Sequence, residues 1–165
     1  MPTYFANEDG NYTPEKASAL ARLVVLSDQL SPEELTELLG LAPDKSWRLG
    51  ELTTGGRPYR HHGWELDSRL PQDRPAEEQL SDVLERLAPI APAVGSLANN
   101  PAVFRARLWL VRHGENGNPG LSLSLESIRQ IDALGVGLEI DMYISEAGKQ
   151  DLPDLGRPAP PQLPH

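Results

Sequence analysis

Residues 31–40 carry the start and stop signals of a single α-helix, and these signals limit the fold more than any other part of the sequence. Ser31 is suited to the N-cap and Pro32 to the first helical position. Glu34 stands three residues after Ser31, which is the spacing of a capping box. Gly40 can take the left-handed conformation with which many helices end. The sequence therefore predicts a short helix with defined ends, in a segment that offers no reactive side chain.

Strands and helices alternate on either side of this helix. The spacing of apolar residues predicts strands at residues 19–27, 59–67, 103–111 and 138–144, and further helices at residues 76–87 and 125–134. This order predicts an α+β fold with helices on one face of a mainly antiparallel sheet, similar to a ferredoxin-like arrangement. Residues 89–101 are expected to be a connector, and residues 121–124 a short strand that pairs back as a hairpin.

Alternation also predicts which side chains of the later elements face the core. In the strand at 103–111, the inward residues are expected to be Phe104, Ala106, Leu108 and Leu110, and the outward residues Arg105, Arg107 and Trp109. In the helix at 125–134, the buried residues are expected to be Leu125, Ile128, Ile131 and Leu134. In the last strand, the inward residues are expected to be Leu138, Ile140, Met142 and Ile144, and the outward residues Glu139, Asp141 and Tyr143.

The length of 165 residues suits one domain that buries a core without crosslinks. We expect residues 17–147 to form this domain, residues 1–16 to be poorly ordered, and residues 148–165 to be a Pro-rich tail. The tail favours extended polyproline conformation, either as a solvated segment or as a ligand for an aromatic groove. The chain has no Cys, which excludes disulfides, thiol catalysis and Cys-based zinc sites.

The charge balance narrows the class of partner. A formal net charge of -9 and a pI near 4.9 argue against nucleic acid, which rewards clustered Lys and Arg. Acidity at this level favours solubility, and it also suits steering toward a basic protein. The first residues lack the basic segment and the following apolar segment of a signal peptide. No run of apolar residues approaches the length of a membrane span. We therefore expect a cytoplasmic protein without a membrane partner.

One group of residues is the best candidate for a binding surface, because Trp and Arg are enriched at interface hot spots. Its members are Trp47, Arg48, Arg57, Arg60, His61 and Trp64. Trp64 also fits a position in the core, whereas for Trp47 the loop position leaves core and surface equally open.

Signals for catalysis or metal binding are weaker. His61 and His62 would point to opposite faces of a strand, so a metal site would need Glu65 or His113 from elsewhere. Glu139 and Asp141 share a strand face, where the alternatives are an acid–base pair or ion pairs with Arg105 and Arg107. No Gly-x-Ser-x-Gly elbow presents a serine nucleophile. The sequence therefore predicts no catalytic residue, no metal site and no cofactor.

Three segments resemble a family of small bacterial proteins known as domain of unknown function number four-two-seven-nine. These are the helix at 31–40, the segment from Trp47 and Gly50 to Trp64, and the strand that contains Asp141 and Tyr143. The resemblance covers about residues 18–146. It implies a compact bacterial α+β domain and carries over no catalytic residue.

Together these observations favour a non-enzymatic domain that binds another protein, as an immunity or accessory factor encoded beside its partner. The alternative is a small-molecule-binding or hydrolytic enzyme, with a cleft around Trp47, Arg60, His61 and Glu65. Convergence of these side chains on a deep pocket would favour the enzyme, and a position on a flat face would favour the binding domain.

Overall fold

The computed structural model describes residues 4–6, 12–14, 18–115 and 120–145. In chain order the elements are β1 (Tyr4–Ala6), β2 (Tyr12–Pro14), β3 (Ser18–Ser27), α1 (Pro32–Leu39), β4 (Lys45–Trp47), β5 (His62–Asp67), α2 (Ala76–Leu87), the 3-10 helix η1 (Ala88–Ile90), α3 (Ala91–Ala98), β6 (Val103–Glu115), α4 (Leu125–Leu134) and β7 (Gly137–Ser145). The expected tail at 148–165 lies outside the described residues, and the expected domain limits stay a prediction.

A five-stranded sheet in the order β4-β5-β3-β6-β7 forms the centre of the fold. The β4–β5, β5–β3 and β3–β6 pairs are antiparallel, and the β6–β7 pair is parallel. Strands β1 and β2 pair only with each other among the described residues. The mixed α+β class with a mainly antiparallel sheet is confirmed. The ferredoxin-like arrangement is not confirmed, since α4 joins β6 and β7 as parallel neighbours.

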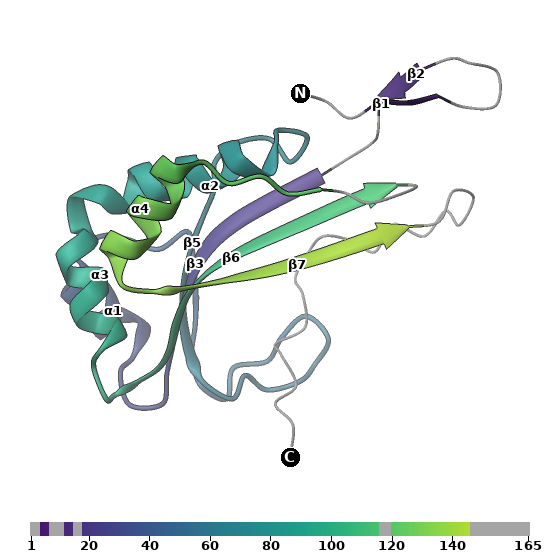
Figure 1. Ribbon diagram of the computed structural model, residues 1–165. Helices are drawn as coiled ribbons and strands as arrows, with labels where there is room; N and C mark the ends of the chain where they lie inside the picture. The colour runs from purple at the N-terminus through teal and green to yellow at the C-terminus, as the bar shows by residue number, and fades with distance from the viewer. Residues whose placement is uncertain (1–3, 7–11, 15–17, 116–119, 146–165) are drawn as a thin grey trace.

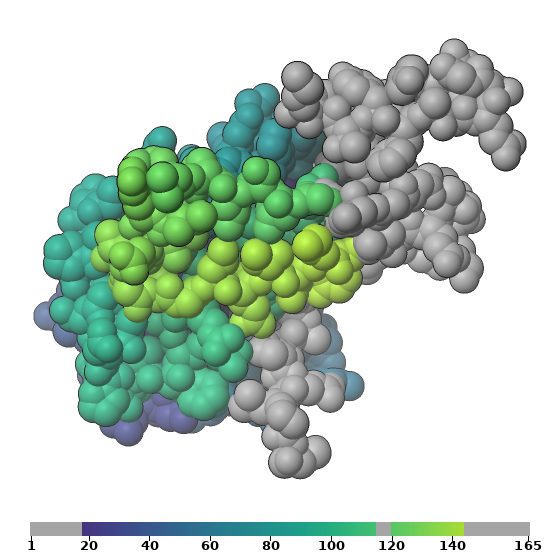
Figure 2. All heavy atoms as spheres, in the orientation of Figure 1, coloured from purple at the N-terminus to yellow at the C-terminus, as the bar shows by residue number. Residues whose placement is uncertain are grey.

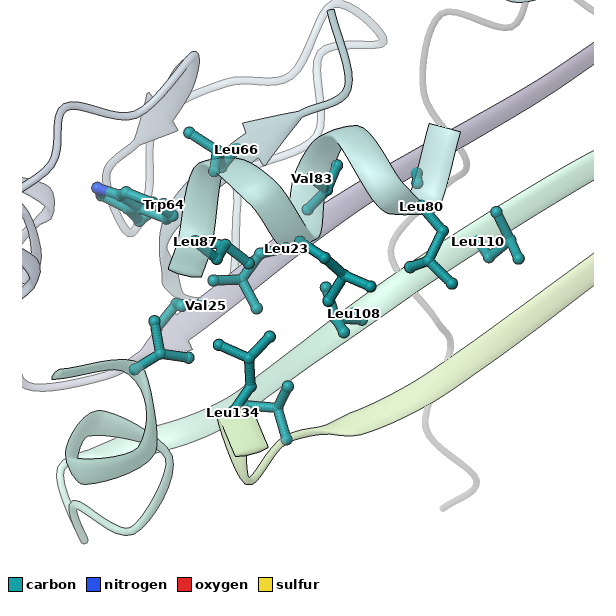
Figure 3. Close-up of a cluster of buried hydrophobic side chains, with 14 of the residues drawn as sticks. Leu23, Val25, Trp64, Leu66, Leu80, Val83, Leu87, Leu108, Leu110 and Leu134 are labelled. Carbon is teal, nitrogen blue, oxygen red and sulfur yellow. The ribbon is translucent and has the colours of Figure 1, made fainter. Parts of the chain in front are cut away.

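The helices lie together on one face of the sheet, and none of the described helices lies on the other face (Figure 1). The core lies between the two layers, where α2 places leucine and valine side chains over β3 and β6 (Figure 3). Leu23 on β3 and Leu108 on β6 are paired neighbours with no exposed surface. We call the opposite side of the sheet the helix-free face.

The ends of α1 and α4 follow from local sequence, as predicted. The Ser31 Oγ accepts a hydrogen bond from the Glu34 N–H at 3.3 Å, and the Glu34 Oε2 accepts one from the Ser31 N–H at 2.8 Å. Gly40 closes α1 with φ of 67°. The Ser124 Oγ caps α4, and Gly135 closes that helix with φ of 68°. The ends of α2 also agree with the predicted range.

Two segments between these elements differ from expectation. Residues 89–101 are not a plain connector, because they contribute to η1 and form α3. Pro89 and Pro92 occupy the first turns of these helices, where a missing N–H costs nothing. Residues 121–124 form no strand and pair with no other strand in the described part of the chain.

The predicted inward faces of α4 and β7 are only partly buried. Leu134 is buried, but Leu125 and Ile128 on α4 and Ile140 and Met142 on β7 are exposed. Helix α4 turns Ser127 inward, where its hydroxyl donates to the Glu77 carboxylate of α2 at 2.6 Å. Strand β7 is at the edge of the sheet, so its apolar side extends beyond the cover of the helices.

Phe104 is also exposed, in contrast to its predicted inward position. The β3–β6 register shifts between Leu26 and Ser27, so Phe104 is the extra residue of a β-bulge.

Candidate functional site

A long hairpin connects β4 to β5, and we name residues 48–61 the 48–61 hairpin. Its two arms are joined by backbone hydrogen bonds from Gly50 N–H to the Tyr59 carbonyl at 2.9 Å and from Tyr59 N–H to the Glu51 carbonyl at 2.9 Å. Leu52 and Pro58 form a further antiparallel bridge. The hairpin extends from the sheet on the side away from the helices (Figure 1). Strand β5 therefore begins at His62, three residues later than predicted.

Trp47 fastens this hairpin to the helix-free face. The Trp47 and Tyr59 rings are stacked, with their centroids 4.9 Å apart and their planes at 23°. The Trp47 indole lies directly over Gly63, its partner in the β4–β5 ladder. A Cβ at Gly63 would lie 1.9 Å from the Trp47 Cε2, so only glycine fits beneath this ring. The half-buried Trp47 thus supports the hairpin from below.

The outer part of the hairpin presents apolar and basic side chains to solvent. Leu49 is 48% exposed and Leu52 is 66% exposed. Arg57 and Arg60 are exposed as well. Arg48 is also exposed, and its guanidinium pairs with the Glu33 carboxylate of α1 at 2.7 Å. Arginines beside exposed apolar side chains fit the composition of a protein-contact surface, because arginine is enriched at such surfaces.

The two neighbouring histidines have separate partners. His61 is paired with the Asp28 carboxylate, and its ring stacks on Phe104 with a centroid separation of 4.6 Å. The His62 Nδ1 accepts a hydrogen bond from the Leu49 N–H at 3.1 Å. His113 lies on β6, where it stacks on Tyr143 of β7. Within the described ranges, no three His, Asp or Glu side chains are grouped as a metal site would require.

Trp64 is separated from the other predicted site residues. It is fully buried on the helix side of β5, one residue along the strand from Gly63 and therefore on the opposite face from Trp47. Figure 3 shows its ring beside Leu66 and the α2 side chains. The structure thus brings Trp47, Arg48, Arg57, Arg60 and His61 to the 48–61 hairpin and its base. Trp64 occupies the core position that the sequence also allowed.

Glu65 belongs to a charged cluster on the helix-free face, and the sequence analysis missed the other two members of this cluster. Arg22 on β3 lies 3.1 Å from the Glu65 carboxylate and 3.2 Å from the Asp67 carboxylate, both on β5. Glu65 is 4% exposed and Arg22 is 7% exposed. The sequence holds a signal for the cluster, since Glu65 and Asp67 alternate with Trp64 and Leu66 as a polar strand face requires.

Burial raises the pKa of the Glu65 carboxyl to about 7. The Arg22 guanidinium opposes this increase, whereas the negative charge of Asp67 adds to it. Glu65 therefore changes its charge close to neutral pH, unlike an exposed glutamate.

The carboxylates that the sequence did single out have structural partners. Arg107 pairs with Glu139 at 2.7 Å, which confirms the expected cross-strand ion pair. The Asp141 carboxylate accepts a hydrogen bond from the Trp109 Nε1–H at 2.8 Å. Arg105 contacts neither acid among the described interactions and instead lies over the Phe104 ring, 5.8 Å from its centroid.

These features define a small α+β domain that has one helix-covered face and a projecting, partly apolar hairpin. The chain belongs to the family described as Domain of unknown function (DUF4279), whose profile matches residues 15–145. No curated protein and no solved structure matches the chain. Among the described residues, the helices are too short or too polar to cross a membrane.

Proposed function

We propose that this domain is a non-enzymatic module that binds another protein through the 48–61 hairpin. The observation that carries the proposal is the exposure of Leu49 and Leu52 on a frame fixed by backbone hydrogen bonds. A rigid contact element loses little conformational entropy on binding, so more of its contact energy contributes to affinity. Trp47 stacked over Gly63 is the support that keeps this element in place.

The charge of the hairpin indicates what its partner offers. Residues 48–61 contain three Arg and one Glu, although the whole chain has a net charge of -9. Such a local reversal of sign selects a surface with carboxylates around an apolar patch. An immunity or accessory factor that covers the functional surface of its partner would bind through such a hairpin. A toxin or effector gene beside the gene for this chain would support that role.

The test is capture of the partner with the immobilised full chain from a lysate of the source organism, followed by mass spectrometry. Arg60→Ala is the test variant, and Arg129→Ala is the matched control because Arg129 is an exposed arginine on α4. We expect Arg60→Ala to weaken capture by about 2 kcal/mol, which is roughly a thirtyfold change in Kd. Arg129→Ala should bind the partner like the wild type. Both variants should have the melting temperature of the wild type. If Arg60→Ala and Arg129→Ala capture the partner equally well, the 48–61 hairpin is not the binding surface.

A second function, a small-molecule-binding or hydrolytic enzyme around Trp47, Arg60, His61 and Glu65, is favoured by one observation. The pKa of Glu65 near 7 is the value that suits a general acid or base at neutral pH. Hydrolysis of a panel of simple esters and phosphoesters would test it. Turnover by the wild type that disappears in Glu65→Gln, while partner capture is retained, would favour the enzyme.

A further inference from the structure

Strand β7 is an unusually open edge of the sheet. It pairs with β6 from residue 137 to residue 145 without a bulge, and it has no neighbour on its other side among the described strands. At nine residues it is longer than most strands, whereas the opposite edge strand β4 has three residues. Its outer row of N–H and C=O groups is therefore a template for another strand.

Strand β7 lacks several of the features that protect edge strands, namely lysine, proline and a β-bulge. Residues 137–145 contain no Lys, no Arg and no Pro. Ile140 is 39% exposed and Met142 is 47% exposed on the helix side of the strand. Leu125 and Ile128 are exposed on α4, which forms the near surface of the molecule together with β7 (Figure 2). Apolar side chains thus accompany the open backbone edge.

We propose that β7 pairs with β7 of a second copy of this chain, antiparallel about a two-fold axis at Met142. Two-fold pairing is self-complementary, because each residue that faces a position on the partner is faced by it in return. In this register Met142 lies opposite its own copy and residue 140 opposite residue 144, which is also Ile. Asp141 lies opposite Tyr143, and Glu139 opposite Ser145.

The acidic residues of β7 disfavour the registers centred on the two preceding residues. Centring the axis on Ile140 would place Glu139 opposite Asp141, and centring it on Asp141 would place that residue opposite itself. Like charges directly opposite each other destabilise a strand pair. Each acid is also held by its own chain, Glu139 by Arg107 and Asp141 by Trp109. Because these acids already have partners in their own chain, β7 can pair with a second β7 and does not require a basic partner strand.

The net charge of -9 per copy gives the association a characteristic response to salt. Two acidic domains repel each other at long range, and salt screens this repulsion. Added salt should therefore tighten the β7 contact, whereas it should weaken binding of an acidic partner to the basic 48–61 hairpin. Because β4 and β7 are opposite edges of the sheet, the two contacts are independent and their failures can be told apart.

Sedimentation of the full chain at about 50 mM and about 500 mM NaCl tests the association. We expect a concentration-dependent dimer that is several-fold tighter at high salt. Met142→Lys places two ammonium groups at the axis and should raise the dimer Kd by about tenfold or more. Leu52→Lys makes the same charge change on the 48–61 hairpin and should leave the dimer intact. Circular dichroism of each variant checks that the fold is retained.

Cysteine crosslinking tests the register, and the chain brings no cysteine of its own. Residues directly opposite in an antiparallel pair have Cα atoms about 4.5–5.5 Å apart, within reach of a disulfide. Met142→Cys should therefore form a crosslinked dimer under mild oxidation. Ile140→Cys should not, because its two copies would be separated by four residues of strand, roughly 13 Å.

Three results would overturn the proposal. Equal crosslinking of Met142→Cys and Ile140→Cys would refute the register. A Met142→Cys variant that stays monomeric at all concentrations, with its thiol shielded from thiol reagents, would show that another part of the chain covers the edge. A monomeric Met142→Cys variant with a freely reactive thiol would show that the edge is open but does not bind a second copy. Its partner strand would then belong to a different protein.

Discussion

The buried Glu65 carboxyl makes the stability of this domain depend on pH in a direction opposite to that of most acids. Its pKa is raised from 4.5 to about 7, so between these values the folded chain holds a proton that the unfolded chain has released. The folded state then binds more protons than the unfolded state, and stability falls as pH rises through this window. The slope falls to about half of its maximum at pH 4.5 and at pH 7, and it vanishes well outside this window.

The size of the effect follows from the same two values. Each unit of pKa corresponds to about 1.4 kcal/mol, so Glu65 accounts for a loss of about 3 kcal/mol between pH 4.5 and pH 8. The steepest slope is about 1.4 kcal/mol per pH unit, near pH 6. Glu65→Gln keeps the shape of the side chain but cannot ionise, so this variant should lack that component.

Urea unfolding of the wild type and Glu65→Gln at intervals from pH 4.5 to pH 8 measures the difference directly. Burial lowers the pKa of His113 and gives a slope of the opposite sign, but this slope is common to both chains and cancels in the difference. Glu85→Gln, at an exposed position of α2, controls for the loss of a carboxylate elsewhere. If the profiles of the wild type and Glu65→Gln run parallel over the whole range, the raised pKa is refuted.

Five further substitutions test how the fold and the hairpin are held. Ser31→Ala removes the capping box of α1 and Gly40→Ala places a side chain at positive φ; each should lower the free energy of unfolding by about 1 kcal/mol, and unchanged urea midpoints would place the helix ends elsewhere. Gly63→Ala pushes a methyl group into the Trp47 ring and should cost about 1–3 kcal/mol with a change in tryptophan fluorescence. Trp64→Ala empties a fully buried site and should cost about 3–5 kcal/mol in the same assay, more than Trp47→Ala. If Trp47→Ala and Trp64→Ala lower the free energy of unfolding equally, the base of the hairpin has a structural role only.

The parts of the fold that could be predicted from sequence are those fixed by neighbouring residues. The ends of α1 and α4 depend on side chains within one turn, Ser31 and Gly40 in one case and Ser124 and Gly135 in the other. Helix α3 could not be predicted in this way, because Pro92 and Gly95 are residues that usually interrupt helices. Proline is nonetheless tolerated in the first helical turn, and only the surrounding fold shows that this segment begins there.

Burial and site geometry required contacts that no local pattern encodes. The apolar stripe of α4 predicted that Leu125 and Ile128 would be buried, but the helix packs on α2 and α3 through Ser127 and Leu134. For the candidate site, Trp and Arg composition pointed to the right segment of chain. It could not place Trp47 and Trp64 on opposite faces, because that depends on the β4–β5 register.

The central position of β3 determines when this domain can complete its sheet during synthesis. Strand β3 is made early, yet one of its two neighbours is β6, with Ser27 paired to Val103 and Ser18 to His113. At about 5–20 residues per second, the ribosome needs several seconds to produce that partner. Until then the nascent chain can pair β3 only with β5, and the other edge of β3 stays open until β6 is made. Slowed translation between residues 67 and 103 should therefore lengthen the period in which a chaperone is needed.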